Sequence, residues 1–188
     1  MNDADCFALS EATDGAAAGA DIVFGVILGT GVGGGIVVQG RALQGPNLIT
    51  GEWGHNPLPW PTTEEVDGPS CYCGKRGCIE TLLAGPFIEA AYAKRTGTAK
   101  KLVDIPKSDP LMMERIELFG RALSIIVNVV DPDVIVLGGG VSNLDALYTE
   151  GVAAVARWTF NDSLETKIVK HALGDSAGVL GAALLPPT

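Results

Sequence analysis

Three cysteines and a histidine form the pattern with the most specific chemistry in this sequence. Cys71, Cys73 and Cys78 fall within eight residues, and His55 precedes the first of them by sixteen positions. Three thiolates and one imidazole make a closed tetrahedral ligand set that suits Zn²⁺ and leaves no position for a reacting water. Two glycines between the second and third cysteines supply tight turns. We therefore predict a structural zinc site at these four residues, with three reduced surface thiols as the alternative.

Two glutamates flank this cysteine-rich segment. Glu52 lies three residues before His55, and Glu80 lies two residues after Cys78. If zinc orders the loop, it brings Glu52, His55 and Glu80 together as groups that bind hydroxyls. One imidazole nitrogen would then ligate the metal, and the other would hydrogen-bond a ligand. The alternative is that both glutamates are solvated surface residues.

Glycine-rich segments follow two predicted strands. The run from 29 to 35, Gly-Thr-Gly-Val-Gly-Gly-Gly, matches the dinucleotide fingerprint only in form, because that fingerprint requires a following helix and a strand is predicted here. Converging N–H groups beside the Thr30 hydroxyl could bind an anion, and a hairpin turn without a ligand is the alternative. A second cluster, Gly138-Gly139-Gly140, ends a buried strand and could equally be a tight turn.

Composition limits the fold and the partners. The chain has 188 residues and a net charge of −9, from 13 Lys and Arg against 22 Asp and Glu, and 47% of its residues are hydrophobic. Such a chain is globular and long enough to bury a core without disulfides. The acidic balance argues against nucleic acid or an anionic membrane surface as a partner. No apolar run reaches the ~20 residues of a membrane helix and no export signal is found, so we expect a cytoplasmic protein.

The elements that position these residues alternate along the chain. Asn2 and Asp3 are typical of a helix start, and small or apolar residues continue to position 12. Residues 51–80 are irregular, which is uncommon unless something orders them. Strands are predicted at 22–28, 36–38, 134–137 and 167–171, and helices at 82–95, 110–130, 144–158 and 177–185. The order predicts an α/β fold, in which helices flank a mixed sheet.

Taken together, these segments resemble the ROK family, which groups repressors, open-reading-frame proteins and sugar kinases. The run at 52–60 looks most like the family's bacterial fructokinase and mannokinase branch. The resemblance covers essentially the whole chain and implies an actin-like (ribonuclease H-like) ATPase lobe with a zinc-stabilised loop at 51–80. It is carried by Asn2-Asp3-Ala4, Gly29-Thr30-Gly31-x-Gly33, Gly51-Glu52-Trp53-Gly54-His55-Asn56-Pro57, Cys71-x-Cys73-Gly74-x-x-Gly77-Cys78-x-Glu80, Val136-Leu137-Gly138-Gly139-Gly140 and Gly174-Asp175-Ser176-Ala177-Gly178.

The resemblance implies transfer of the γ-phosphoryl group of ATP to a hexose. Fructose, phosphorylated at its 6-hydroxyl, is the expected substrate, with mannose and glucose as alternatives. Asp3 matches the family's catalytic base, and Mg²⁺ would accompany ATP. A homodimer is also expected. The sugar ligands would be Asn2, Asp3, Glu52, His55 and Glu80, and the nucleotide would be held by Gly29, Thr30, Gly31, Gly33, Gly138 and Gly139.

One family motif is not found between residues 1 and 188. It is the phosphate loop of Asp-x-Gly-Gly-Thr-Lys type that opens a preceding lobe. We therefore expect residues 16–188 to be a C-terminal lobe, residues 1–15 to be a helix remaining from the N-terminal lobe, and the chain alone to be a poor kinase. The alternatives are a non-catalytic sugar-binding or oligomerisation module, and a sugar-responsive repressor, which would need a separate helix-turn-helix to bind DNA.

Overall fold

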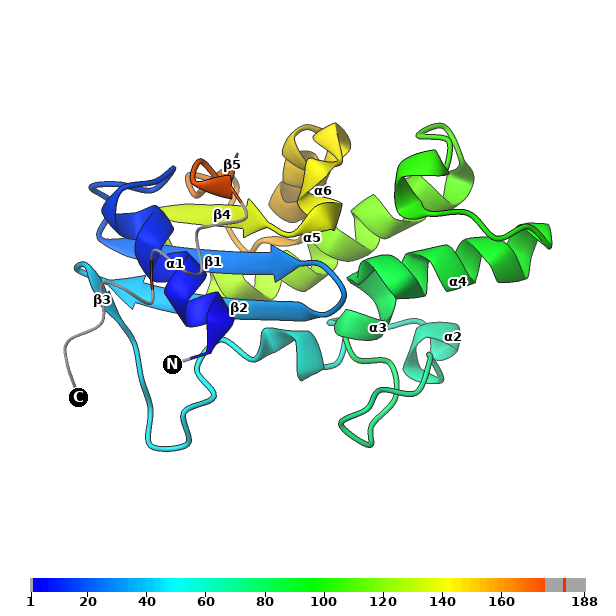
Figure 1. Cartoon of the computed structure of the whole chain (residues 1–188), viewed down its shortest axis with the longest axis horizontal. Helices are drawn as coiled ribbons and strands as arrows, with labels where there is room; N and C mark the ends of the chain where they lie inside the picture. Colours follow the sequence, from blue (N-terminus) through cyan, green and yellow to red (C-terminus); the bar gives the residue numbers. More distant parts are fainter. Residues whose placement is uncertain (1, 175–180, 182–188) are drawn as a thin grey trace.

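The computed structural model of this chain describes residues 2–174 and 181, and its elements alternate as expected (Figure 1). Of the predicted helix at 177–185 only Gly181 is described, and most of the last family motif, at 175–178, lies outside the described residues. The helices are α1 (Asp3–Thr13), α2 (Thr63–Val66), α3 (Glu80–Leu83), α4 (Gly85–Thr96), α5 (Pro110–Val130) and α6 (Glu150–Trp158). The strands are β1 (Ile22–Leu28), β2 (Val32–Val38), β3 (Arg41–Ala42), β4 (Val134–Gly138) and β5 (Lys167–Lys170). Short 3₁₀ turns are η1 (Trp53–His55), η2 (Leu102–Asp104), η3 (Gly140–Asn143) and η4 (Asp145–Tyr148).

The strands form one mixed sheet in the order β3-β2-β1-β4-β5. β1 and β2 make the predicted antiparallel hairpin, whereas β1, β4 and β5 run parallel. Ile27, near the end of β1, pairs with Gly138 at the end of β4. The carboxyl ends of both strands and the turn between β1 and β2 therefore lie at one edge of the sheet (Figure 1). This edge is where ligands bind in open α/β sheets.

Helices cover both faces of the sheet, as predicted. α1 packs through Phe7 and Ala8 against one face, which includes Val23 and Val136. α5 and α6 cover the other face in a cluster that includes Phe24. Adjacent residues of β1 thus face opposite helices, as expected for a strand buried on both sides. In Figure 1, α1 crosses in front of the sheet and α5 runs behind it.

The start of α1 is fixed by its cap and by close packing on β2. Asn2 caps the helix, because its side chain accepts a hydrogen bond from the Asp5 N–H at 2.8 Å and the Asp5 carboxylate accepts one from the Asn2 N–H at 3.2 Å. At Gly35, a Cβ atom would lie 2.6 Å from the carbonyl oxygen of Ala4. Glycine in β2 therefore lets this end of α1 approach the strand.

The structure corrects three element boundaries. The second strand begins at Val32 rather than at Ile36, so Gly33 and its two successors are strand residues and not part of the turn. The helix predicted at 82–95 is divided at Ala84 into α3 and α4, and the helix predicted at 144–158 starts with the 3₁₀ turn η4. Among the described residues, no helix is long and apolar enough to cross a membrane.

Candidate functional site

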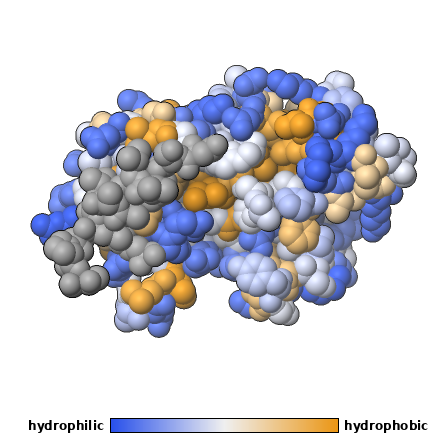
Figure 2. Space-filling view, viewed as in Figure 1, coloured by the Kyte–Doolittle hydropathy of each residue, from blue (hydrophilic) through white to orange (hydrophobic). Residues whose placement is uncertain are grey.

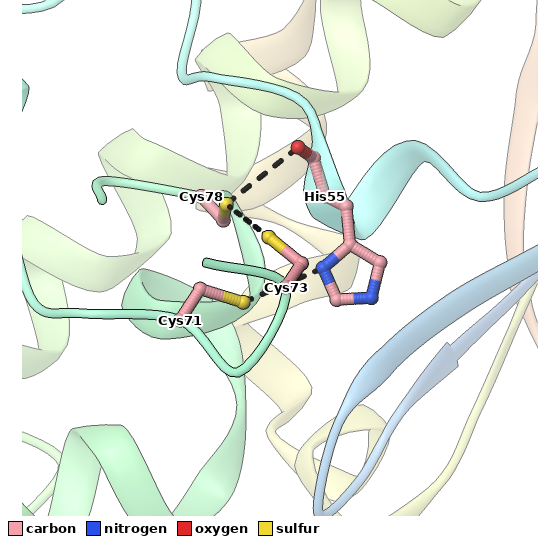
Figure 3. A group of neighbouring side chains, drawn as sticks. All are labelled: His55, Cys71, Cys73 and Cys78. Carbon is pink, nitrogen blue, oxygen red and sulfur yellow. Dashed lines mark hydrogen bonds between the residues drawn. The ribbon is translucent and has the colours of Figure 1, made fainter. Parts of the chain in front are cut away.

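The predicted metal ligands come together in the structure (Figure 3). One candidate ligand atom from each of His55, Cys71, Cys73 and Cys78 lies within 4.8 Å of the others. The His55 Nδ1 atom is 3.4 Å from Cys71 Sγ, and Cys73 Sγ is 3.6 Å from Cys78 Sγ. Zn–S and Zn–N bonds of about 2.3 and 2.0 Å in a tetrahedron separate neighbouring ligand atoms by about 3.5–3.8 Å. The four residues therefore fit Zn²⁺ in chemistry and in spacing.

Local structure holds the ligands in this arrangement. The η1 turn carries His55, and the indole of the buried Trp53 in the same turn donates to the Gly33 carbonyl at 3.0 Å. Pro57 forms an isolated β-bridge with Cys78, which ties the histidine segment to the cysteine segment. Burial raises the pKa of the Cys78 thiol to about 12, whereas a hydrogen bond from the Lys75 backbone lowers the pKa of Cys73.

Glu80 connects the cysteine cluster to the hairpin. Its side chain is buried, and its Oε2 atom accepts a hydrogen bond from the Val32 N–H at 3.0 Å. Its Oε1 atom lies 3.8 Å from Cys71 Sγ. A Cβ atom at Gly31 would lie 2.6 Å from Glu80 Oε2, so glycine there admits the carboxylate. The predicted residues Gly31 and Glu80 are therefore direct neighbours.

A hydrogen bond between distant residues brings the start of α1 to the same loop. Asn2 Nδ2 donates to Glu52 Oε1 at 3.2 Å across fifty positions of sequence. Asp3, the next residue, is exposed, and its Oδ1 atom accepts a hydrogen bond from the Ala4 N–H at 3.0 Å. Glu52 precedes η1 and so lies next to His55 in the chain. Three contacts thereby connect the predicted sugar ligands. Asn2 is hydrogen-bonded to Glu52, Glu52 directly precedes the turn that carries His55, and His55 lies against Cys71, which is next to Glu80.

The other imidazole nitrogen of His55 already has a partner. His55 Nε2 lies 2.8 Å from the hydroxyl of Tyr72, a residue that sequence reasoning missed. Tyr72 lies between two predicted ligands in the sequence, and nothing in its local pattern indicates that its side chain turns back onto the histidine.

A cavity lies where the glycine segments meet, at the carboxyl ends of β1 and β4. Its volume is about 510 Å³, and it is lined by Gly29, Thr30, Lys101 and Gly140 among others. The remaining predicted nucleotide residues do not line this cavity: Gly31 faces Glu80, Gly33 is part of β2, Gly138 ends β4 against Phe7, and Gly139 packs on the Leu28 carbonyl. Lys101, whose ammonium is paired with Glu89 at 3.2 Å, was not predicted.

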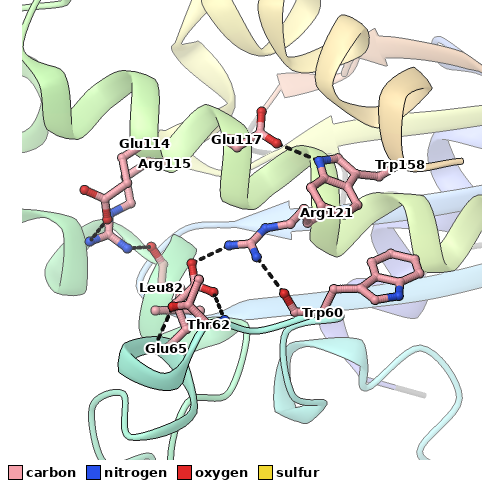
Figure 4. Close-up of polar contacts among 9 residues, drawn as sticks. All are labelled: Trp60, Thr62, Glu65, Leu82, Glu114, Arg115, Glu117, Arg121 and Trp158. Atoms are coloured by element: carbon pink, nitrogen blue, oxygen red, sulfur yellow. Dashed lines mark hydrogen bonds and ion pairs between the residues drawn. The ribbon is translucent and has the colours of Figure 1, made fainter.

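A polar clamp fastens the loop at 51–80 to the helices (Figure 4). Arg121 of α5 donates to the Trp60 carbonyl at 2.9 Å and forms an ion pair with Glu65 of α2. Trp158 of α6 stacks on Trp60 with ring centroids 5.4 Å apart. Burial opposes ionisation of Glu65, but hydrogen bonds from Arg121 and Thr62 outweigh it and lower the pKa of Glu65. The sequence feature that could have indicated this contact was Arg121, a charged residue on the apolar side of α5.

Comparisons with known proteins place the chain in a family. The ROK family model matches residues 1–188. The chain is 40% identical to an N-acetyl-D-glucosamine kinase of Vibrio vulnificus and 41% identical to that of Vibrio cholerae, in each case over 98% of this chain and 65% of the relative. It therefore spans about two thirds of the length of these curated relatives.

Solved structures share the fold over nearly the whole chain. A ROK hexokinase from Thermus thermophilus has a TM-score of 0.85 and 32% identity, with 98% of this chain and 63% of that chain covered. A ROK family glucokinase from Streptomyces griseus has a TM-score of 0.81 and 26% identity, covering 97% and 66%. A ROK family transcriptional regulator, a homologue of the E. coli MLC protein, has a TM-score of 0.79 and 28% identity, covering 98% and 50%. This chain belongs to the ROK family and has the actin-like α/β fold of its sugar kinases.

Proposed function

We propose that this chain is the sugar-binding part of an ATP-dependent hexose kinase that phosphorylates the sugar 6-hydroxyl. The observation that carries this proposal is the hydrogen bond between Asn2 and Glu52. It holds the start of α1, where Asp3 lies, against a loop whose polar residues include Glu52 and His55. A carboxylate next to hydroxyl-binding groups is what proton removal from a sugar requires.

In the proposed reaction, Asp3 accepts the proton of the 6-hydroxyl as the sugar oxygen attacks the γ-phosphorus. The bond from that phosphorus to the bridging oxygen breaks, and ADP leaves. Asn2, Glu52, His55 and Glu80 orient the sugar through its other hydroxyls. A sugar that lacks a matching hydroxyl leaves one of these groups unpaired, which favours discrimination among hexoses.

The nucleotide would lie in the cavity lined by Gly29 and Thr30. Because the chain carries a net charge of −9, backbone N–H groups and Mg²⁺ would supply most of the positive potential that phosphates need. Gly31, Gly33, Gly138 and Gly139 support the same site indirectly, since they shape the ends of the strands around it. Zinc would hold the loop and take no part in the reaction.

Two hexoses are the candidate substrates. The run at 52–60 favours fructose, and the relatives with about 40% identity are named N-acetyl-D-glucosamine kinases. We propose fructose as the substrate because of this run, and N-acetyl-D-glucosamine as the alternative substrate. Mannose and glucose serve as comparison sugars. A kinase of this kind consumes ATP, so we place it in the cytoplasm.

We also propose a homodimer. Leu48 and Ile49 are 68% and 60% exposed on the loop after β3, and an apolar surface is visible where that loop projects (Figure 2). Exposed apolar patches mark interaction surfaces. Light scattering on the purified chain measures the oligomeric state.

A calorimetric and kinetic experiment tests the kinase proposal. Zinc-loaded chain should bind fructose or N-acetyl-D-glucosamine saturably, and Glu52→Ala should weaken that binding about tenfold or more because a charged hydrogen-bond acceptor is lost. Asp3→Asn should keep most of the sugar affinity and reduce sugar-dependent ADP release about 100-fold or more. A folded chain that binds no hexose would contradict the proposal. Sugar-dependent ADP release that Asp3→Asn leaves unchanged would show that Asp3 is not the catalytic base.

A further inference from the structure

Tyr72 is an exposed aromatic residue held on the candidate sugar site. Tyr72 is 84% exposed, yet its hydroxyl lies 2.8 Å from His55 Nε2. The two rings are perpendicular, with centroids 4.9 Å apart. In the chain, Tyr72 lies between Cys71 and Cys73 of the four-residue cluster. The tyrosine can therefore release His55 by turning its side chain, without moving the loop.

The nitrogen that Tyr72 occupies is the one left for a ligand. His55 Nδ1 faces the thiols, since it lies 3.4 Å from Cys71 Sγ. A neutral imidazole nitrogen carries either one hydrogen or one lone pair in the ring plane, so it forms one hydrogen bond at a time. A sugar hydroxyl and the Tyr72 hydroxyl therefore cannot both bind Nε2.

The tyrosine hydroxyl has the same hydrogen-bonding capacity as a sugar hydroxyl, one donor and two acceptor lone pairs.

We infer that the Tyr72 hydroxyl is a built-in substitute for a sugar hydroxyl, and that a hexose must displace it from His55 Nε2 to bind. Tyr72 then lowers the affinity of every hexose that uses His55 Nε2 by the same factor, because each must offset the same lost hydrogen bond. This inference rests on the proposed function.

Tyr72→Phe tests the inference, because it removes the hydroxyl and keeps the ring. Calorimetric titration with fructose, N-acetyl-D-glucosamine, glucose and mannose should show affinity about two- to tenfold higher in the variant than in the original chain, the range expected for loss of one competing hydrogen bond. Metal analysis should give the same zinc content in both proteins. Tyr148→Phe is the matched control, since the Tyr148 hydroxyl donates to the Ser142 carbonyl at 2.8 Å, away from the cluster, and its loss should leave hexose affinity unchanged.

A second measurement reports on the contact itself. The ¹⁵N resonance of His55 Nε2 should shift in sugar-free Tyr72→Phe, and an unchanged resonance would refute the contact. Hexose affinity that is equal or lower in Tyr72→Phe overturns the inference and leaves the proposed function standing. If neither protein binds any of the four hexoses, the proposed function fails and the inference fails with it.

Discussion

Glu80 shows how one side chain can serve two parts of a site. Its Oε2 atom accepts the Val32 N–H at the start of β2, and its Oε1 atom lies beside Cys71 of the cluster. A carboxylate has about four lone-pair positions, so these contacts leave capacity for a sugar hydroxyl. The position of Glu80 therefore depends on both the cysteine loop and the hairpin, and a change in either would reach the proposed sugar site through this residue.

We expect Glu80→Ala to lower the free energy of unfolding by about 1–3 kcal/mol, because it leaves the buried Val32 N–H without its acceptor. Urea unfolding of the zinc-loaded protein measures this change. Glu80→Gln is the control: its amide oxygen can still accept from Val32, so most of the stability should remain. Equal losses in the two variants would show that the Val32 hydrogen bond is not the reason.

Side-chain pairings over long sequence distances could not be predicted from the sequence. The cluster of His55 and the three cysteines could be predicted, because three closely spaced cysteines and a histidine are typical of a metal site. The bonds from Tyr72 to His55 and from Arg121 to Glu65 were not, since neither pair belongs to a motif of defined residue types and spacing. Such pairs depend on how the loop folds on itself and onto α5, which local patterns do not encode.

At the scale of elements, the glycines of β2 lie in the strand and not in the turn that the sequence predicted. Gly33 and Gly35 appear in the sequence as an extension of the turn, but they are strand residues beneath α1. Their small size reflects the close approach of a helix, which only the packing reveals. The helix itself was predictable from its cap and its small and apolar residues, as was α5 from Asp109, which caps it, and Pro110. Local signals thus predicted where most elements lie, and packing decided which residues shape the site.

We expect Gly35→Ala to displace the start of α1, because the new Cβ would lie 2.6 Å from the Ala4 carbonyl oxygen. The free energy of unfolding should fall by about 1–3 kcal/mol, as in other overpacked cores. Hexose affinity should fall about tenfold, since Asn2 would move away from Glu52. Urea unfolding and calorimetry measure the two effects.

Gly45→Ala is the control, because its Cβ would make an ordinary 3.8 Å contact with Thr50, and both quantities should change little. If hexose affinity is unchanged in Gly35→Ala, sugar binding does not depend on the position of α1.

At the scale of the whole molecule, the loop at 51–80 joins parts that are far apart in the sequence. Through Glu52 it contacts the start of α1, through Trp53 it contacts β2, and through Glu65 it contacts α5. Short 3₁₀ and α-helical turns, isolated bridges and side-chain contacts hold it, with no extended strand. A metal at the cysteine cluster would therefore stabilise the arrangement of the entire site, in addition to its own ligands.

We expect a strong chelator to lower the melting temperature by about 10 °C, because metal binding contributes directly to folding free energy. Hexose affinity should be lost with the metal, since Glu52, His55 and Glu80 depend on the same loop. Trp53 is 2% exposed, so loosening of the loop should shift the tryptophan emission of the protein to longer wavelength.

Cys73→Ser should reproduce these effects without chelator. Cys6→Ala should retain one zinc per chain, because Cys6 lies on α1 and is not part of the cluster. If chelation removes zinc while hexose affinity and tryptophan emission stay constant, the metal does not order the sugar site.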